Sequence, residues 1–152
     1  MKIEQVIKTS STLDFPTKTV INLMYTTRIM EEAVSSVLKE YDLTTPQYNV
    51  LRILRGQKGT PASLSCIQER MVDKNSNTTR LVDKLIKKSF ADRRICPHNR
   101  RKVEIIITES GLDLLKKLDP VTRDTNAKML ENLTKKEIET LNNLLDKLRT
   151  HE

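Results

Sequence analysis

The residues best suited to chemistry in this chain are cations gathered between Arg70 and Lys102. This stretch holds eleven Lys or Arg against three Asp, a net charge of +8, whereas the whole 152-residue chain carries +7. The rest of the chain is therefore nearly neutral. Lys and Arg gathered in this way displace the counterions condensed on phosphate groups. The distribution indicates a nucleic-acid surface, although a solvated charged face would have the same composition.

Short polar side chains lie inside this basic stretch, ahead of an apolar stripe at helical spacing. Leu81, Val82, Leu85 and Ile86 form the stripe and predict a helix over about 76–88. Small polar residues and one Arg at the start of such a helix suit the major groove. Helix capping is their alternative, structural role. We predict a recognition helix with these contact residues: Asn75, Ser76, Asn77, Thr79, Arg80 and Lys84.

Two β-rich segments follow the predicted recognition helix and enclose a turn at 97–100. Val103, Ile105 and Ile107 alternate with other residues along the second segment, as in a half-buried strand. The pattern predicts a β-hairpin with a basic tip, which can reach an adjacent minor groove. The predicted contact residues of this wing are Arg93, Asn99, Arg100, Arg101 and Lys102.

Helical segments are predicted ahead of this region. Apolar residues recur at helical spacing over 15–41. A second helix is expected to have Thr45 as its cap and Pro46 at its first position, and to end before Gly56. Ser63 can cap a short third helix, so that two short helices with a tight turn form a helix-turn-helix unit.

Two further helices are predicted after the hairpin. One begins over 108–111, and the other opens with the capping box that Thr134 and Glu137 form. The predicted order is α-α-α-α-β-β-α-α. This is a mainly α fold, a winged helix-turn-helix with terminal dimerisation helices.

The pattern divides the chain into regions. We expect a flexible N-terminus over 1–14, a winged helix-turn-helix DNA-binding domain over 45–107, and a helical dimerisation region formed by 15–44 and 108–152. The terminal helices carry more apolar stripe than one small winged domain can cover, which favours a homodimer. The predicted dimer interface consists of Ile138, Leu141, Leu144 and Leu148.

Several motifs resemble those of the MarR family of bacterial transcriptional regulators. The segment Thr79-Arg80-Leu81-Val82-Asp83-Lys84-Leu85 is similar to the family's T-R-L-V-D-x-L. Asn99-Arg100-Arg101 corresponds to D-R-R, and Ile107-Thr108-x-x-Gly111 to L-T-x-x-G. The alignment runs without a gap over 64–111. Two departures are Ser89, where the family usually has Gly, and Asn99, where it usually has Asp.

The resemblance implies a function and a set of partners. Family members are homodimers joined by their first and last helices, and many are repressors released by small phenolic or anionic ligands, or by oxidation. The implied partners are double-stranded DNA, a second copy of the chain, and a small aromatic or anionic effector. Arg100 would enter the minor groove. Family effector pockets are apolar clefts between dimerisation and DNA-binding helices, which here suggests Met24, Met30, Tyr48, Leu51, Leu112 and Leu115.

The two cysteines leave a redox alternative open. Cys66 lies beside an apolar stripe and is expected to be a buried, inert thiol. Cys96 lies in the wing near several arginines, which stabilise a thiolate, so a redox-sensing regulator is one alternative. Cys96 and His98 are too few for a metal site, and no catalytic motif occurs. We therefore expect no enzyme activity, no metal and no cofactor.

A constitutive architectural DNA-binding protein or an RNA-binding protein without an effector is the other alternative. RNA-binding modules usually stack bases on aromatic side chains, and this chain has three Tyr, two Phe and no Trp. No apolar run approaches the ~20 residues of a membrane span. The N-terminus lacks the apolar region of a secretory signal, and two cysteines make no disulfide framework. These features predict a cytoplasmic protein without membrane contact.

Overall fold

Seven helices and three strands make up the part of the chain that the structure describes. The computed structural model describes 1–96 and 99–150, and the side chains of 96–102 lie outside the described part. The predicted winged helix-turn-helix order is confirmed, with a short N-terminal helix and a short strand in addition. The elements are α1 (Ile3–Val6), α2 (Phe15–Lys39), α3 (Thr45–Gly56), β1 (Ala62–Ser63), α4 (Leu64–Arg70), α5 (Thr78–Lys87), β2 (Ala91–Cys96), β3 (Asn99–Ile107), α6 (Glu109–Met129) and α7 (Lys135–Leu148).

Side-chain caps determine where the helices begin, and two of them correct the predicted boundaries. Thr44, not Thr45, caps α3, because Thr44 and Gln47 form a reciprocal capping box. Helix α5 begins at Thr78, two residues later than predicted, because the Asn77 side chain accepts a hydrogen bond from the Arg80 N–H. The predicted capping box of α7 and the cap of α4 are confirmed.

The N-terminal segment, which we expected to be flexible, contains the short helix α1. Ile3 is buried, and Glu4 forms an ion pair with Lys18 of α2 at 2.6 Å. That ion pair holds the pKa of the Glu4 carboxyl below its ordinary value. The expectation was based on the polar composition of 1–14, which conceals one apolar residue that packs.

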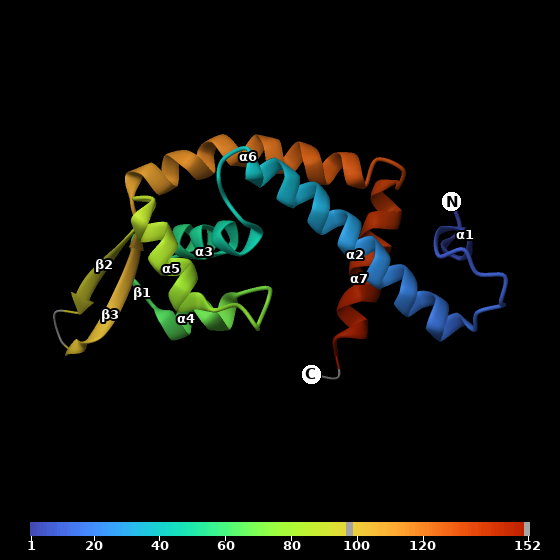
Figure 1. Cartoon of the computed structure of the whole chain (residues 1–152), viewed down its shortest axis with the longest axis horizontal. Helices are drawn as coiled ribbons and strands as arrows, with labels where there is room; N and C mark the ends of the chain where they lie inside the picture. The colour runs from blue at the N-terminus through green and yellow to red at the C-terminus, as the bar shows by residue number, and fades with distance from the viewer. Residues whose placement is uncertain (97–98, 151–152) are drawn as a thin grey trace.

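The three strands form an antiparallel sheet in the order β1-β3-β2. Ala62 of β1 pairs with Ile105, and Ala91 of β2 pairs with Ile107. Ile105 and Ile107 are buried and Val103 is half-exposed, so the predicted alternation holds near the body of the protein. The hairpin of β2 and β3 projects at the end of the molecule far from both termini (Figure 1).

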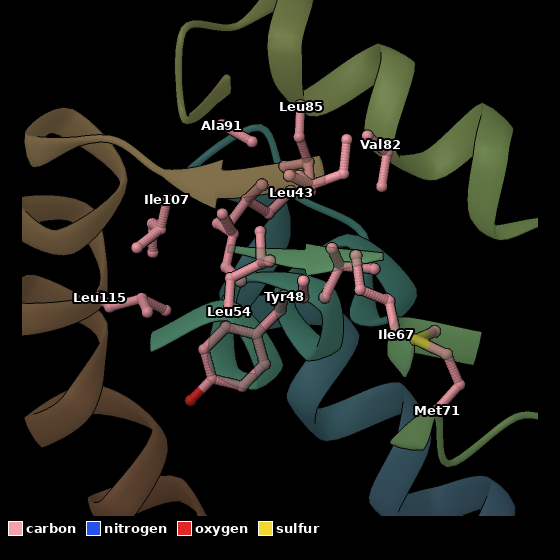
Figure 2. Close-up of a cluster of buried hydrophobic side chains, with 14 of the residues drawn as sticks. Leu43, Tyr48, Leu54, Ile67, Met71, Val82, Leu85, Ala91, Ile107 and Leu115 are labelled. Carbon is pink, nitrogen blue, oxygen red and sulfur yellow. The ribbon is translucent and has the colours of Figure 1, made fainter. Parts of the chain in front are cut away.

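A single apolar cluster joins α3, α4, α5, the sheet and α6 (Figure 2). Helix α3 contributes Val50, Leu51 and Leu54, and α5 contributes Val82 and Leu85, all of them essentially inaccessible to solvent. Burying each such side chain stabilises the fold by about 1.5–3 kcal/mol. The core therefore fixes one face of α5 and leaves its opposite face at the surface.

Helix α6 begins in very close contact with the end of the recognition region. A Cβ atom at Gly111 would lie 2.3 Å from the carbonyl oxygen of Phe90 and 2.8 Å from the Ile107 side chain. Real Cβ atoms do not approach backbone oxygen so closely. Only glycine permits this packing, which fixes the long α6 helix to the segment between α5 and β2.

Candidate nucleic-acid interface and adjacent cleft

The exposed face of α5 is a row of cations. Arg80, Lys84 and Lys87 are spaced four and three residues apart and are all exposed, whereas Val82 and Leu85 are buried on the opposite side. The amphipathic stripe that buries one face thus directs the positive side chains outward together. A helix of this kind can lie along a groove of duplex DNA.

The polar run at the start of α5 is divided between surface and structural roles. Asn75, Asn77 and Thr79 are exposed. However, the Asn77 side-chain oxygen is already engaged as the helix cap, at 3.0 Å from the Arg80 backbone nitrogen. Thr78 is buried and its hydroxyl donates to Gln68. Capping and packing therefore explain part of a run that we had attributed chiefly to recognition, with capping as the alternative.

Ser76 is not a surface residue in the way the sequence suggested. It is half-buried, and its hydroxyl oxygen is shielded from solvent with no hydrogen-bond partner among the described residues. An unpaired buried hydroxyl is costly. Ser76 would contact DNA only after a local change in the turn that precedes α5.

In the wing, Arg93 has a partner that the sequence did not reveal. Its guanidinium donates to the Asp83 carboxylate of α5 at 2.5 Å, and both side chains are about half exposed. Arg93 therefore braces β2 against α5. The other predicted wing residues, Asn99, Arg100, Arg101 and Lys102, have side chains outside the described part of the chain.

A tight turn connects α5 to the wing. The Phe90 N–H donates to the Leu85 carbonyl at 3.0 Å, and the Ser89 N–H donates to the Ile86 carbonyl at 2.9 Å. These two bonds form a Schellman motif, whose central residue adopts the left-handed conformation. Ser89 has φ of 63°. The departure from the family's usual glycine thus falls at a position where glycine is favoured.

Two further lysines, Lys39 and Lys88, continue the basic surface beyond the exposed face of α5. Lys39, Lys84, Lys87 and Lys88 surround a hollow of about 430 Å³ next to the start of α3. Lys88 is paired with Asp42 at 2.9 Å. The positive surface therefore extends from the recognition helix to the C-terminal end of α2.

The cysteines occupy less simple positions than we expected. Cys66 is half-buried rather than buried, and its sulfur accepts a hydrogen bond from Arg70 at 2.8 Å. This contact places a cation beside the thiol. The side chains of Cys96 and His98 lie outside the described residues. Within the described part, no group of three or more potential metal ligands occurs.

The terminal helices expose apolar side chains. Leu141, Leu144 and Leu148 of α7 are 37%, 59% and 61% exposed, and Ile138 is half-buried. Helix α2 likewise exposes Phe15 and other apolar residues along its length. Side chains of this size are seldom left in water in rows. The helices therefore present apolar surface for which the described part of the chain supplies no cover.

A cleft of about 1230 Å³ lies between α2, α3, α6 and the turn before α5. Of the six predicted effector-cleft residues, only Tyr48 lines it. Leu51 and Leu115 are fully buried in the core, Met30 and Leu112 are half-buried, and Met24 is exposed on α2. Apolar residues were predicted to line the cleft, but those at helical spacing form the core instead. The residues around the cleft are mostly polar: Arg28, Glu31, Glu32, Val34, Ser35, Ser36, Lys39, Thr45, Pro46, Tyr48, Asn49, Arg52, Arg55, Met71, Val72, Asp73, Asp119, Thr122, Arg123 and Asn126.

One wall of the cleft contains a bidentate salt bridge between α3 and α6. Arg55 of α3 donates to both carboxylate oxygens of Asp119 of α6, at 2.8 and 3.0 Å. These bonds hold the pKa of the Asp119 carboxyl below its ordinary value, and the charges of Arg55, Arg52 and Arg123 lower it further. Asp119 neutralises Arg55, which leaves Arg52 and Arg123 as exposed cations on the cleft wall.

The largely buried Tyr48 ring borders the same cleft. Arg52 lies over the Tyr48 ring, with its guanidinium carbon 5.8 Å from the ring centre. The Tyr48 hydroxyl lies 3.3 Å from the Thr122 hydroxyl, which fixes the ring between α3 and α6. An anion could therefore pair with Arg52 and Arg123 at the edge of this ring. The sequence alone did not identify Arg52, Arg123 or Asp119, because no local motif marks them.

Comparison with known proteins shows that this chain is similar to transcriptional regulators. Residues 43–103 match the model of the MarR family. The HTH-type transcriptional repressor IacR of Pseudomonas putida is 29% identical over 110 residues, which cover 72% of this chain. The matched region spans 65% of that relative, slightly less than two thirds of its length.

Solved structures share the fold over almost the whole chain. The organohalide-sensing RdhR transcriptional regulator, solved with 2,4-dichlorophenol bound, has a TM-score of 0.83 at 21% identity and matches 92% of this chain and 82% of its own. The Bordetella bronchiseptica BpsR structure, which concerns regulation of DNA binding by 6-hydroxynicotinic acid, has a TM-score of 0.80 at 19% identity over 92% and 99% of the two chains. No helix in the described part is long and apolar enough to cross a bilayer.

Proposed function

We propose that this chain, which matches the MarR family of transcriptional regulators over residues 43–103, is a repressor that binds duplex DNA as a homodimer. The observation that carries the proposal is the exposed row of Arg80, Lys84 and Lys87 on a helix whose other face is buried. Phosphate attraction explains the cations, and Arg80, near the helix start, can read a base edge in the major groove. The wing residues Arg100 and Arg101 add contacts in the minor groove.

The test removes the Arg80 side chain from the recognition helix and compares the effect with the loss of one positive charge elsewhere on the surface. Arg80→Ala is expected to weaken operator binding by about 1–3 kcal/mol and to relax base preference. Lys128→Ala removes the same charge from an exposed position near the end of α6 and serves as the control. Gel-shift titration on a selected operator measures both. Equal affinities for the wild type, Arg80→Ala and Lys128→Ala would contradict the docking of α5 on DNA.

The proposal places the dimer interface on the terminal helices, 15–44 and 108–152. Its support is the apolar surface that α2 and α7 leave exposed, including Leu144 and Leu148. A twofold dimer would place two recognition helices about 34–36 Å apart, one turn of DNA, so that each reads one half of a pseudo-palindromic site.

A charge at this surface tests the assembly. Leu144→Glu would bury an unpaired carboxylate in the interface and weaken the dimer. The variant should be monomeric at protein concentrations where the wild type is still a dimer, and its operator binding should weaken as well. Asn143→Glu adds the same charge at an exposed position on the face of α7 farthest from the predicted interface residues by helical spacing. Sedimentation at micromolar concentration is the measurement. A wild-type monomer that binds the operator, or equal dissociation of the two variants, would exclude this interface.

We place the effector in the cleft of about 1230 Å³, where a small aromatic anion would pair with Arg52 and Arg123 beside the largely buried Tyr48 ring. The two related structures that bind or respond to small aromatic compounds support an effector of this class. Calorimetry with 6-hydroxynicotinate and other aromatic carboxylates tests the site. Arg123→Gln is expected to lower the affinity, whereas Lys128→Ala should leave it unchanged.

A further inference from the structure

We propose that Asn49 couples the cleft to the recognition helix by holding the turn that precedes α5. The inference rests on the proposed effector function and names how that site is regulated. Asn49 lies on α3, lines the cleft, and touches the turn between α4 and α5. It is therefore a positioning residue that contacts both the candidate ligand site and the DNA-reading element.

The contact with the turn is a single hydrogen bond. The Asn49 side-chain oxygen accepts from the Val72 backbone N–H at 2.9 Å. Met71, just before it, is buried in the core, whereas Val72 is 86% exposed. Val72 thus gains little from packing, and its backbone depends on Asn49 for a partner.

The turn's other side-chain anchors come from within the helix-turn-helix itself. Gln68 of α4 donates to the Lys74 carbonyl at 2.8 Å and accepts from Thr78. These contacts move together with α4 and α5. Among the described residues, Asn49 is the one side chain from outside 64–87 that hydrogen-bonds the turn, whereas Asp73, which accepts from the Asn75 N–H, belongs to the turn itself. A change at Asn49 can therefore shift the turn relative to α3.

The nitrogen of the Asn49 side-chain amide has no hydrogen-bond partner among the described residues. A primary amide offers one acceptor oxygen and two N–H donors. The oxygen is occupied by Val72, while no described residue accepts a hydrogen bond from the Asn49 nitrogen. Arg52 lies one turn further along α3 and lines the same cleft. A carboxylate paired with Arg52 can accept from the Asn49 nitrogen as well.

The consequence is a local switch next to the residues that read DNA. A carboxylate that pairs with Arg52 and draws the Asn49 nitrogen toward itself rotates the amide, and this rotation removes the partner of the Val72 N–H. The turn then relaxes, and it leads directly into Asn75, Ser76 and the cap residue Asn77. The ligand must bind the relaxed state more tightly, because equal affinity for the two states shifts nothing. The expected loss of operator affinity is on the order of 5- to 20-fold.

Two substitutions at Asn49 separate its two ends. Asn49→Asp keeps the acceptor for Val72 but loses the donor and repels a carboxylate. Asn49→Leu keeps the approximate shape of the side chain and loses both the acceptor oxygen and the N–H donors. Asn126→Asp is the matched control, because Asn126 lines the cleft on α6 and no described contact joins it to the turn. The probe is 6-hydroxynicotinate, with benzoate as a second carboxylate.

The readouts are operator affinity with and without the probe, probe affinity by calorimetry, and exchange of the Val72 amide by NMR. Without probe, Asn49→Leu is expected to speed Val72 exchange and weaken operator binding about fivefold or more, while Asn49→Asp does neither. The probe should speed Val72 exchange in the wild type and in Asn126→Asp at saturation, but not in Asn49→Leu.

The outcomes distinguish the relay from the effector site itself. Unchanged Val72 exchange and operator affinity in Asn49→Leu would overturn the relay. So would a probe effect on operator affinity of equal size in the wild type and Asn49→Leu; in both cases the effector site would stand. Failure of both carboxylates to bind the wild type would overturn the proposed effector class, and the relay with it.

Discussion

Ser89 provides the sharpest test of how the recognition helix is joined to the wing. Its φ of 63° is left-handed, and it occupies the central position of the Schellman motif that ends α5. The side chain is exposed, and no described residue hydrogen-bonds to its hydroxyl. Only its backbone is engaged: the N–H donates to the Ile86 carbonyl at 2.9 Å, and the carbonyl accepts from the Thr108 hydroxyl at 2.7 Å. Ser89→Gly therefore changes the backbone preference and removes no contact.

The magnitude follows from two opposing effects. The left-handed conformation costs a residue with a Cβ atom about 1–2 kcal/mol, and glycine avoids this cost. Glycine loses more backbone entropy on folding, which offsets about 0.4–1 kcal/mol. We expect Ser89→Gly to raise the free energy of unfolding by about 0.5–1 kcal/mol. For a chain of this length that corresponds to a rise in Tm of roughly 1–4 °C.

The assay is urea and thermal unfolding at one fixed protein concentration, because dimerisation makes the apparent stability depend on concentration. Lys87→Gly is the matched control. Lys87 is exposed in the last turn of α5 with helical backbone, so glycine there should lower stability by about 0.5–1 kcal/mol. If both glycine variants shift stability in the same direction, the reasoning from the backbone conformation of Ser89 is wrong.

Two further predictions concern packing and pH. Gly111→Ala places a methyl group against the Phe90 carbonyl and should lower the free energy of unfolding by about 1–3 kcal/mol. In Gly56→Ala the added methyl meets no atom within 4 Å, so that variant should be at least as stable as the wild type in the same denaturation assay. Equal losses of stability in the two variants would refute the packing argument. The Asp119 carboxyl has a lowered pKa, so its contribution to stability is present at neutral pH and is lost as the pH falls below its ordinary value of 3.8. Asp119→Asn should therefore be less stable than the wild type in urea titrations at pH 7, with the difference shrinking toward pH 3; a difference that grows on acidification would have the wrong sign.

Local patterns in the sequence were sufficient for the architecture. The spacing of Val82 and Leu85 predicted which face of α5 is buried, and the structure confirms it. Side-chain caps such as Ser63 and Thr134 predicted helix starts. These features depend on residues at most four positions apart. Their physical cause, backbone hydrogen bonding within one turn and burial of one face, is present in the local sequence.

The boundaries of α3 and α5 show where this reasoning loses precision. Two neighbouring residues, Thr44 and Thr45, have the same capping chemistry, and the reciprocal bond from Gln47 selects Thr44. At the start of α5, three neighbouring polar residues could cap the helix, Asn75, Ser76 and Asn77, and the structure shows Asn77 as the cap. Thr78 is polar by composition but buried, because Gln68 of α4 satisfies its hydroxyl. The sequence shows that a cap exists, but tertiary packing decides which of the candidate residues is the cap.

What the sequence by itself determined is the order of elements, the basic recognition helix and the family resemblance. The tertiary structure decided which of those residues are available for function. It pairs Arg93 with Asp83, it buries Leu51 and Leu115 where an effector cleft was predicted, and it forms the cleft from polar residues instead. The contacts that define the cleft join residues far apart in the chain, Arg55 with Asp119 and Asn49 with Val72. No periodicity encodes such pairs, because they form only when separate helices pack at a particular distance and angle.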